Sequence, residues 1–210
     1  MRLLDLFCGR WGWSRAFAAR GWECVGVDLV EPPEVPKNCS FIQADILTGK
    51  VDCYHKTIWL AHAEWTIWPD FIVASPPCQE FSKHGLRCFY PDPPYPELGV
   101  KLFNHTQALC RESGIPYVIE NVRSAVDFVG NAVHNCGPFY LWGNAVPTLL
   151  PPPILKGRRL TTGGYKRQTG SASDGEASAK VATIPPALAN CVVDYAERIL
   201  EARTTVADGR

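Results

Sequence analysis

The first 28 residues constrain the fold more than any other part of the sequence. Residues 2–7 form a short apolar run that predicts a strand, and the glycine-containing turn 8–12 follows it directly. A helix is expected over about 14–19, and residues 24–28 predict a second strand that closes on Asp28. Strand, glycine turn, helix, strand and acid, in this order, form the nucleotide-binding pattern of α/β proteins with a parallel sheet.

Two acids at strand ends could contact the sugar and the base of a nucleotide. Glycines in a turn let the backbone approach a ligand, and Asp28 could then accept hydrogen bonds from ribose hydroxyls. Residues 41–46 predict a third strand that carries Asp45, which could accept from an adenine amino group. For the glycine turn taken alone, the alternative is an ordinary tight turn without a ligand.

The run at 71–74 organises the middle of the chain. It is apolar throughout, follows Asp70 and ends at a Pro-Pro pair, which is typical of a buried strand that stops abruptly. Cys78 is the first reactive side chain after this strand, at the edge where open α/β sheets bind their ligands. A cysteine held there is placed for covalent chemistry, whereas an isolated cysteine is more often a small core residue.

The following segments predict another helix and strand. Residues 100–113 show helical spacing and end at Gly114, and a strand at 116–122 carries Glu120 at its carboxyl end. A further strand pair is expected near 139–142. For Glu120 without a partner cysteine, binding of nearby backbone amides is an equally good interpretation.

Three other regions have weaker patterns. Residues 51–69 are expected to be a helix or loop, and 80–97 a long loop of the kind that is usually functional or disordered. A last helix is expected from Pro185 onward, and the tail after Arg203 is expected to fray. Three tryptophans of the first region are expected to pack: Trp59, Trp65 and Trp68.

Composition limits the possible partners. With 210 residues, the chain is long enough for one domain, and its formal charge is zero with a pI of about 6.9. A contact with nucleic acid therefore needs a local basic patch. Positive residues are densest in the Pro-, Gly- and Ser-rich stretch 151–180: Lys156, Arg158, Arg159, Lys166, Arg167 and Lys180.

The cysteines indicate a reducing compartment. There are nine, with no Cys-x-x-Cys pair, which argues against a zinc site or a disulfide scaffold and favours the cytoplasm. No metal is therefore expected. The sequence shows no signal peptide and no apolar run of membrane-spanning length, so no membrane contact is expected either.

Taken in order, the motifs resemble those of the DNA (cytosine-5) methyltransferase family. The resemblance covers nearly the whole chain except about 50–68 and 151–180. It implies a Rossmann-like, S-adenosylmethionine-dependent methyltransferase fold, with a mostly parallel sheet and helices on both faces. The matching motifs are Asp5–Gly9, Asp28, Asp45, Pro77-Cys78-Gln79, Glu120-Asn121-Val122 and 184–189.

The resemblance implies a role for each matching residue. Cys78 would add as a thiolate to carbon 6 of cytosine, and the carboxyl of Glu120 would contact ring N3. Binding of S-adenosylmethionine would fall to Phe7, Gly9, Arg10, Gly12, Asp28, Leu29, Asp45, Ile46, Pro77 and Thr183. Contacts to DNA would fall to Gln79, Ser82, Lys83, His84, Arg87, Arg158, Arg159, Lys166 and Arg167.

Three departures from the family pattern stand out. Trp11 occupies a position of the glycine turn where the family usually has glycine. Val181-Ala182 replaces the usual Gly-Asn before the closing motif. The arginine-bearing strand expected after Glu120 is not recognisable, and residues 141–144 take its place.

The resemblance also implies a domain organisation. Residues 1–150 would be the catalytic core, 151–182 a short basic loop in place of a target-recognition domain, 183–203 a helix that completes the core, and 204–210 a frayed tail. Such a loop is too short for its own core, so sequence readout should be minimal, or a partner protein should supply it.

The expected substrate is a cytosine in a short site of double-stranded DNA. The protein is expected to act as a monomer in the cytoplasm of a bacterial or phage-infected cell, in restriction-modification or in protection of phage DNA. Two alternatives stay open: a tRNA cytosine-5 methyltransferase, and a catalytically silent relative that binds nucleic acid or a partner.

Overall fold

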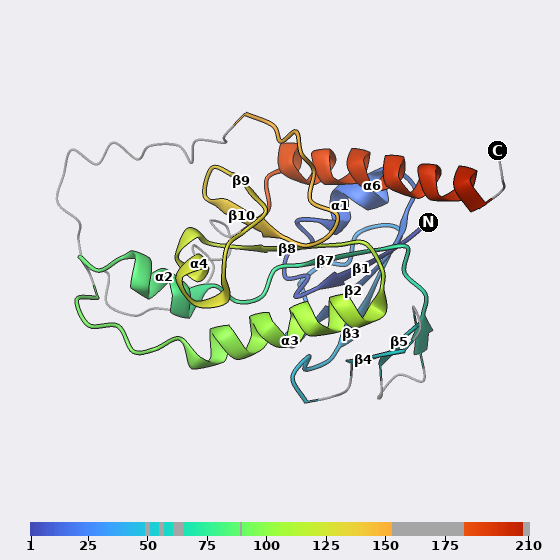
Figure 1. Cartoon of the computed structure of the whole chain (residues 1–210). Helices are drawn as coiled ribbons and strands as arrows, with labels where there is room; N and C mark the ends of the chain where they lie inside the picture. The colour runs from blue at the N-terminus through green and yellow to red at the C-terminus, as the bar shows by residue number, and fades with distance from the viewer. Residues whose placement is uncertain (49–50, 55–56, 61–64, 89, 153–182, 208–210) are drawn as a thin grey trace.

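The computed structural model describes residues 1–210 except 49–50, 55–56, 61–64, 89, 153–182 and 208–210. Within the described residues, seven strands form one sheet in the order β3-β2-β1-β7-β8-β10-β9 (Figure 1). Their bounds are β1 Arg2–Leu6, β2 Glu23–Asp28, β3 Cys39–Gln43, β7 Phe71–Ala74, β8 Tyr117–Asn121, β9 His134–Cys136 and β10 Phe139–Trp142.

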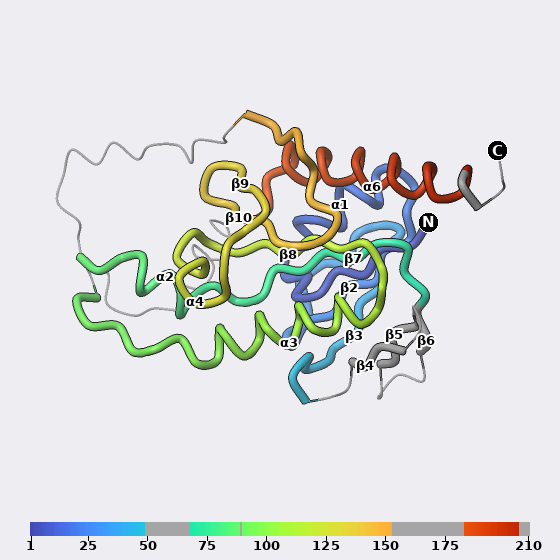
Figure 2. The backbone as a smooth tube through the Cα atoms, in the orientation of Figure 1, coloured from blue at the N-terminus to red at the C-terminus, as the bar shows by residue number. Residues whose placement is uncertain are grey.

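The sheet changes direction between β1 and β7. From β1 the chain proceeds outward through β2 to β3, then returns to β7 and continues outward through β8 on the other side. All five of these strands are parallel, whereas β10 is antiparallel to both β8 and β9. β1 and β7 lie side by side although about 70 residues separate them in the sequence (Figure 2). Ligands of open α/β sheets bind at such a switch point.

Helices cover both faces of the sheet (Figure 1). Because side chains alternate along a strand, Leu4 and Ile72 pack in the cluster that includes residues of α3, whereas Leu3 and Phe71 pack in the cluster that includes α1 and α6. The helices are α1 Ser14–Ala19, α2 Gln79–Gly85, α3 Glu97–Ser113, α4 Val126–Val129 and α6 Pro186–Ala207, with a 3₁₀ turn at Arg123–Ala125.

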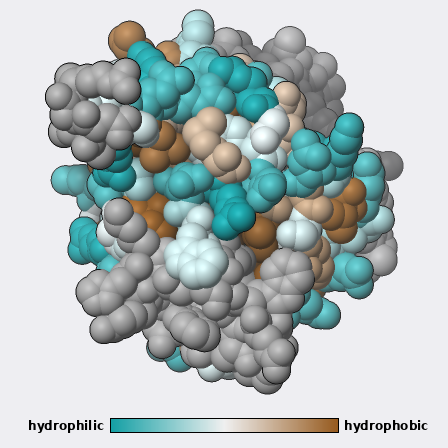
Figure 3. All heavy atoms as spheres, turned by 90° about the vertical axis from the view of Figure 1, so that its right-hand side faces the viewer, coloured by the Kyte–Doolittle hydropathy of each residue, from teal (hydrophilic) through white to brown (hydrophobic). Residues whose placement is uncertain are grey.

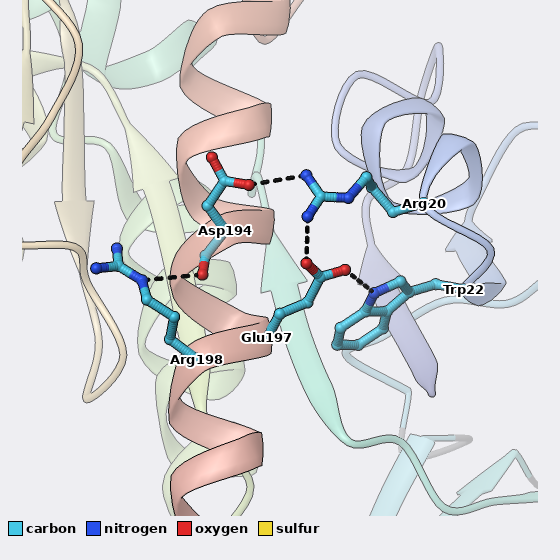
Figure 4. Close-up of polar contacts among 5 residues, drawn as sticks. All are labelled: Arg20, Trp22, Asp194, Glu197 and Arg198. Atoms are coloured by element: carbon cyan, nitrogen blue, oxygen red, sulfur yellow. Dashed lines mark hydrogen bonds and ion pairs between the residues drawn. The ribbon is translucent and has the colours of Figure 1, made fainter.

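Polar contacts join α1 and the start of β2 to the closing helix α6 (Figure 4). The Arg20 guanidinium donates to Asp194 at 2.8 Å and also to Glu197. The indole N–H of Trp22, which is fully buried, donates to the same Glu197 carboxylate at 3.2 Å. One acid therefore connects two groups from the amino-terminal unit to a helix that lies more than 150 residues later in the chain.

The expected elements around the site are confirmed. The helix at 14–19 and the strand at 71–74 have the predicted bounds, and the helix before Gly114 starts only three residues early. Gly114 ends that helix in the left-handed region, with φ of 65°. β3 ends at Gln43, so Asp45 lies beyond the strand that was expected to carry it.

The prediction for residues 51–69 is wrong. This segment forms a second, antiparallel sheet of three strands, β4 Val51–Tyr54, β5 Thr57–Leu60 and β6 Trp65–Ile67. Its composition of β-branched and aromatic residues favours strands, which outweighs the helical interpretation. Trp68, expected to pack, has 56% of its surface exposed.

Two further boundaries differ from expectation. The predicted loop 80–97 begins with the short helix α2. The side chain of Phe81 in this helix is fully buried and packs the helix against the core. The last helix does not end at Arg203 but continues to Ala207. Figure 3 shows the side of the molecule that carries the amino terminus and the amino ends of the parallel strands. Hydrophilic and apolar side chains are mixed on the described part of this side, which lies opposite the carboxyl ends of the strands.

Candidate active site

A cavity of about 430 Å³ lies at the carboxyl ends of β1, β7 and β8. Its walls come from the glycine turn after β1, the Ser75–Ser82 segment after β7, the end of β8, the start of β10 and the approach to α6. This is the switch point of the sheet, so the fold places the cavity where parallel sheets bind ligands.

The glycine turn closes tightly around the end of β2. The backbone N–H groups of Phe7 and Cys8 both donate to the carbonyl of Val27, at 2.8 and 3.2 Å. The N–H of Gly9 donates to the Asp28 carboxylate at 2.9 Å, so the turn and the acid form one continuous part of the cavity wall. Gly9 has φ of 48°, which glycine adopts without strain.

Gly12 is needed because another segment passes directly over it. A Cβ built at Gly12 would lie 3.0 Å from both the Cβ and the backbone nitrogen of Ile184. Both residues line the cavity, together with Thr183. The closing segment therefore returns from the far end of the sequence to form one wall of the site.

Cys78 is positioned by a braced segment after β7. The N–H of Ser75 donates to the Leu6 carbonyl at 3.1 Å, and the indole N–H of Trp13 donates to the Ser75 hydroxyl at 3.0 Å. The side-chain amide of Asn121 donates to the Pro76 carbonyl at 3.0 Å, which ties the end of β8 to the same segment. Cys78 follows, half-buried, at the start of α2.

Glu120 reaches the same cavity from β8. It is the penultimate residue of the strand, pairs with Leu141 of β10, and has only 9% of its surface exposed. Glu120 on β8 and Cys78 in the segment after the neighbouring parallel strand β7 thus line one cavity with the glycine turn and Asp28.

A second cysteine lines the cavity, but its environment differs. Burial raises the pKa of the Cys8 thiol, and the carboxylates of Asp5 and Asp28 raise it further. Cys8 therefore stays a thiol near neutral pH, and a thiol is a poor nucleophile compared with a thiolate. Burial also raises the pKa of Asp5 to about 7, even though the Ser14 hydroxyl donates to it at 2.5 Å.

The structure brings most of the expected residues together. Eleven of them line the cavity: Phe7, Gly9, Arg10, Gly12, Asp28, Pro77, Cys78, Gln79, Ser82, Glu120 and Thr183. Eight others that line it were not among the expected site residues: Cys8, Trp13, Ser75, Pro76, Val122, Pro138, Phe139 and Ile184. Cys8, Val122 and Ile184 belong to matching motifs, and Trp13 directly follows Gly12, so position in or beside a motif was a usable signal for these four.

Three residues expected at the cofactor lie outside the lining. Leu29 follows Asp28 and has 62% of its surface exposed. Asp45 accepts the N–H of Leu47 at 2.9 Å, which forms a local turn. Ile46 is 2% exposed and packs in the core cluster of α3, so its side chain serves the core.

The residues expected at DNA divide into three groups. Gln79 and Ser82 line the cavity, and Lys83 follows them on α2. A ring nitrogen of His84 lies 2.7 Å from the Pro94 carbonyl, and the ring packs edge-on against Phe128, so this histidine has partners within the chain. Arg87 is exposed. Four lie outside the described residues: Arg158, Arg159, Lys166 and Arg167.

No arginine strand follows Glu120 in the described part of the chain. β10 occupies the place beside β8, and its first residue, Phe139, lines the cavity. Among the described lining residues, Arg10 of the glycine turn is the single basic side chain.

The fold and the cavity define the class of the protein. A mostly parallel seven-stranded sheet, with its glycine turn and acid at the switch point, is a Rossmann-like methyltransferase fold that uses S-adenosylmethionine. The chain belongs to the C-5 cytosine-specific DNA methylase family, whose model matches residues 1–134. The cofactor of that family is S-adenosylmethionine.

Three similar solved structures are distant likenesses of this chain. The 1,6-didemethyltoxoflavin-N1-methyltransferase of Burkholderia thailandensis, solved with its namesake compound and S-adenosylhomocysteine, is 16% identical, with a TM-score of 0.33 over 67% of this chain and 53% of that chain. The glycopeptide N-methyltransferase MtfA is 16% identical, with a TM-score of 0.30 over 57% and 45%. A protein of Pyrococcus horikoshii OT3 is 16% identical, with a TM-score of 0.32 over 68% and 67%.

The chain thus spans about half the length of the first two of these methyltransferases, and likenesses this distant do not bear on what it does. Among curated proteins, none matches the chain. In the part of the chain that the structure describes, no helix is long and apolar enough to cross a membrane. The same residues contain no group of three or more histidine, cysteine or acidic side chains that could hold a metal ion.

Proposed function

We propose that the protein transfers a methyl group from S-adenosylmethionine to carbon 5 of a cytosine in DNA. The observation that carries this proposal is the meeting of Cys78 and Glu120 in the same cavity as the glycine turn and Asp28. A nucleophile, an acid and a cofactor wall within one cavity are what a covalent methyl transfer needs.

The residues on the β1–β2 side fit the cofactor. The Asp28 carboxylate, already bound to the Gly9 N–H, has the chemistry to accept from ribose hydroxyls, and Leu29 beside it presents an exposed apolar surface for the adenine. Gly12 leaves room in which Ile184 and the ligand can approach the backbone closely. Arg10 lines this wall, and its guanidinium has the chemistry to bind the carboxylate of the methionine part.

The residues on the β7–β8 side fit the base. When bound, S-adenosylmethionine supplies an electrophilic methyl group. The Cys78 thiolate adds to carbon 6 of cytosine, and the carboxyl of Glu120 at ring N3 stabilises the electron density that moves into the ring. Carbon 5 then takes the methyl group. Loss of the carbon 5 proton and of the Cys78 sulfur restores the aromatic ring and the free thiolate.

Asn121 has a positioning role in this scheme. Its amide holds the Pro76 carbonyl, so it connects the strand of Glu120 to the segment that carries Cys78. The two groups therefore keep their separation fixed, which favours attack on one face of a ring bound between them.

The substrate is proposed to be DNA with the target base flipped out of the helix. Carbon 5 and carbon 6 are inaccessible to a thiolate within the base stack, so the base must enter the cavity. Family membership supports DNA, and the same chemistry would also act on a cytosine in an RNA loop.

The experiment is covalent trapping with duplex DNA that contains 5-fluorocytosine, in the presence of S-adenosylmethionine. Because fluorine cannot leave as a cation, the adduct should persist, and peptide mapping should place it on Cys78. A matched RNA stem-loop tests the RNA substrate. Trapping on RNA alone would replace DNA as the substrate, and an adduct on another cysteine would overturn the assignment of Cys78.

A further inference from the structure

Trp11 has a backbone conformation that residues other than glycine rarely adopt. Its φ is 63°, in the left-handed region, and its side chain is buried with 1% of its surface exposed. A large residue is held in this conformation only where its surroundings fix it, and such residues concentrate at functional sites.

The space for the indole comes from Gly26, in the middle of β2. A Cβ at Gly26 would lie 2.3 Å from Cζ3 of Trp11 and 2.8 Å from the sulfur of Cys8. Strand interiors disfavour glycine unless another group approaches the backbone closely. The indole also meets Phe41 of β3 edge-on, at 6.4 Å between ring centres. Trp11 and Gly26 thus form a complementary pair: Trp11 has a backbone conformation that favours glycine, and Gly26 lies in a strand interior that disfavours glycine.

The polar edge of the same indole bonds to the segment between β2 and β3. Its Nε1–H donates to the carbonyl of Glu34 at 2.9 Å. Glu34 lies within residues 29–38, which begin directly after Asp28. The glycine turn therefore binds Asp28 through Gly9 and the segment that follows it through Trp11 at Glu34. The ion pair of Arg15 with Glu34, at 3.7 Å, is exposed and adds little.

We propose that Trp11 is a positioning residue of the S-adenosylmethionine site, which fixes segment 29–38 beside Asp28. The segment presents Leu29 and Val30, exposed by 62% and 70%, immediately after the acid. An apolar pair beside a ribose-binding acid is a surface on which the adenine ring packs. Trp11 does not line the cavity, so it acts through this segment and not by touching the cofactor. The inference rests on the proposed function only in placing the cofactor at Asp28.

Trp11→Phe tests the proposal, because it keeps an aromatic ring against Gly26 and removes only the N–H to Glu34. Calorimetry of S-adenosylmethionine binding, without nucleic acid, should give a Kd raised about ten-fold, because cofactor binding must then order a segment that the hydrogen bond otherwise holds in place. In methyl transfer, KM for S-adenosylmethionine should rise while kcat at saturation stays the same.

Trp22→Phe is the matched control. It makes the same atomic change in a buried tryptophan, and the N–H that it removes binds Glu197 at the α1–α6 contact. This variant should lower Tm and leave the Kd for S-adenosylmethionine unchanged. A merely structural role for Trp11 would give the same pattern in Trp11→Phe, which would overturn the proposal.

Asp28→Ala separates the inference from the proposed function. If Asp28→Ala weakens binding and Trp11→Phe does not, the inference fails and the placement of the cofactor stands. If neither variant changes the Kd, the cofactor does not lie at Asp28, and the inference fails with that placement.

Discussion

At the scale of single residues, two cysteines share the cavity, and the raised pKa of the Cys8 thiol makes it a poor nucleophile. Cys8 is buried between acidic groups that raise the pKa of its thiol, whereas Cys78 stands half-buried where β7 gives way to α2. Because the thiolate is the nucleophile, the raised pKa of Cys8 argues against a covalent role for this residue, and the covalent role is proposed for Cys78.

Cys78→Ala should abolish methyl transfer to cytosine and leave the Kd for S-adenosylmethionine within a few-fold of the wild-type value. The thiolate acts on the base, and the cofactor wall does not depend on it. Radiolabelled methyl transfer and calorimetry measure the two effects. Cys88→Ala, which removes an exposed cysteine, is the control and should remain active. Activity near wild type in Cys78→Ala would contradict the covalent mechanism.

Asp5 should make stability depend on pH. Burial raises its pKa from 3.8 to about 7, so between these values the folded protein holds a proton that the unfolded chain releases. The free energy of unfolding should therefore fall as pH rises from about 4 to about 7, by on the order of a few kcal/mol.

Asp5→Asn removes this titration and keeps an acceptor for the Ser14 hydroxyl. Urea unfolding at pH 5 and pH 7.5 should show a smaller decrease for the variant than for the wild type. Asp127→Asn, at an exposed acid paired with Arg123, should keep the wild-type decrease. Equal decreases in wild type and Asp5→Asn would show that Asp5 is ionised in both states.

At the scale of elements, α6 completes both the core and the cavity. Its apolar side packs with β1, β7 and α1, while Ile184 just before it contacts Gly12 in the glycine turn. Docking of this helix therefore stabilises the sheet and at the same time fixes the cavity wall that carries Thr183.

Glu197 should contribute more to this docking than Asp194. Glu197 is 18% exposed and accepts from both Arg20 and the buried Trp22 N–H, whereas Asp194 is 56% exposed and binds only one edge of Arg20. Glu197→Ala should lower the free energy of unfolding by about 1–3 kcal/mol, because it leaves a buried N–H unpaired. Asp194→Ala should cost less than about 1 kcal/mol. Urea denaturation measures both, and a reversed order would contradict the assignment.

At the scale of the whole molecule, zero net charge requires any DNA-binding surface to be local. The densest positive stretch in the sequence is 151–180, which lies almost wholly outside the described residues. We expect it to contact phosphates and thus to orient the duplex, because phosphate contacts position DNA without reading its sequence.

Replacing five positive residues of this stretch together by Gln should weaken DNA binding and reduce its dependence on salt. The slope of the log binding constant against the log salt concentration should become shallower by about 0.9 for each phosphate contact that is lost. Fluorescence anisotropy over a salt series measures this slope. A variant with Arg111→Gln and Arg203→Gln, at exposed positions of α3 and α6, should keep the wild-type slope. An unchanged slope in the first variant would exclude the stretch from DNA binding. The five residues are Lys156, Arg158, Arg159, Lys166 and Arg167.

The sequence by itself determined the elements whose signals are local. The helix at 14–19, the strand at 71–74 and the end of α3 at Gly114 follow from apolar spacing and from glycine positions, which act within a few residues. The order of the motifs also predicted the family and the mostly parallel sheet. It placed Cys78 and Glu120 at carboxyl ends of strands, and adjacent parallel strands have their carboxyl ends on one edge.

Only the tertiary structure decided which of these residues meet and in what surroundings. β4, β5 and β6 pair with one another in a small separate sheet, and this pairing between segments has no local signal beyond a composition that favours strands. The Ile46 side chain packs in the core cluster of α3, and Trp11 has a left-handed backbone conformation beside Gly26, a residue of a different strand that leaves room for its indole. Contacts between distant parts of the chain have no period or spacing in the sequence, so packing alone fixes them.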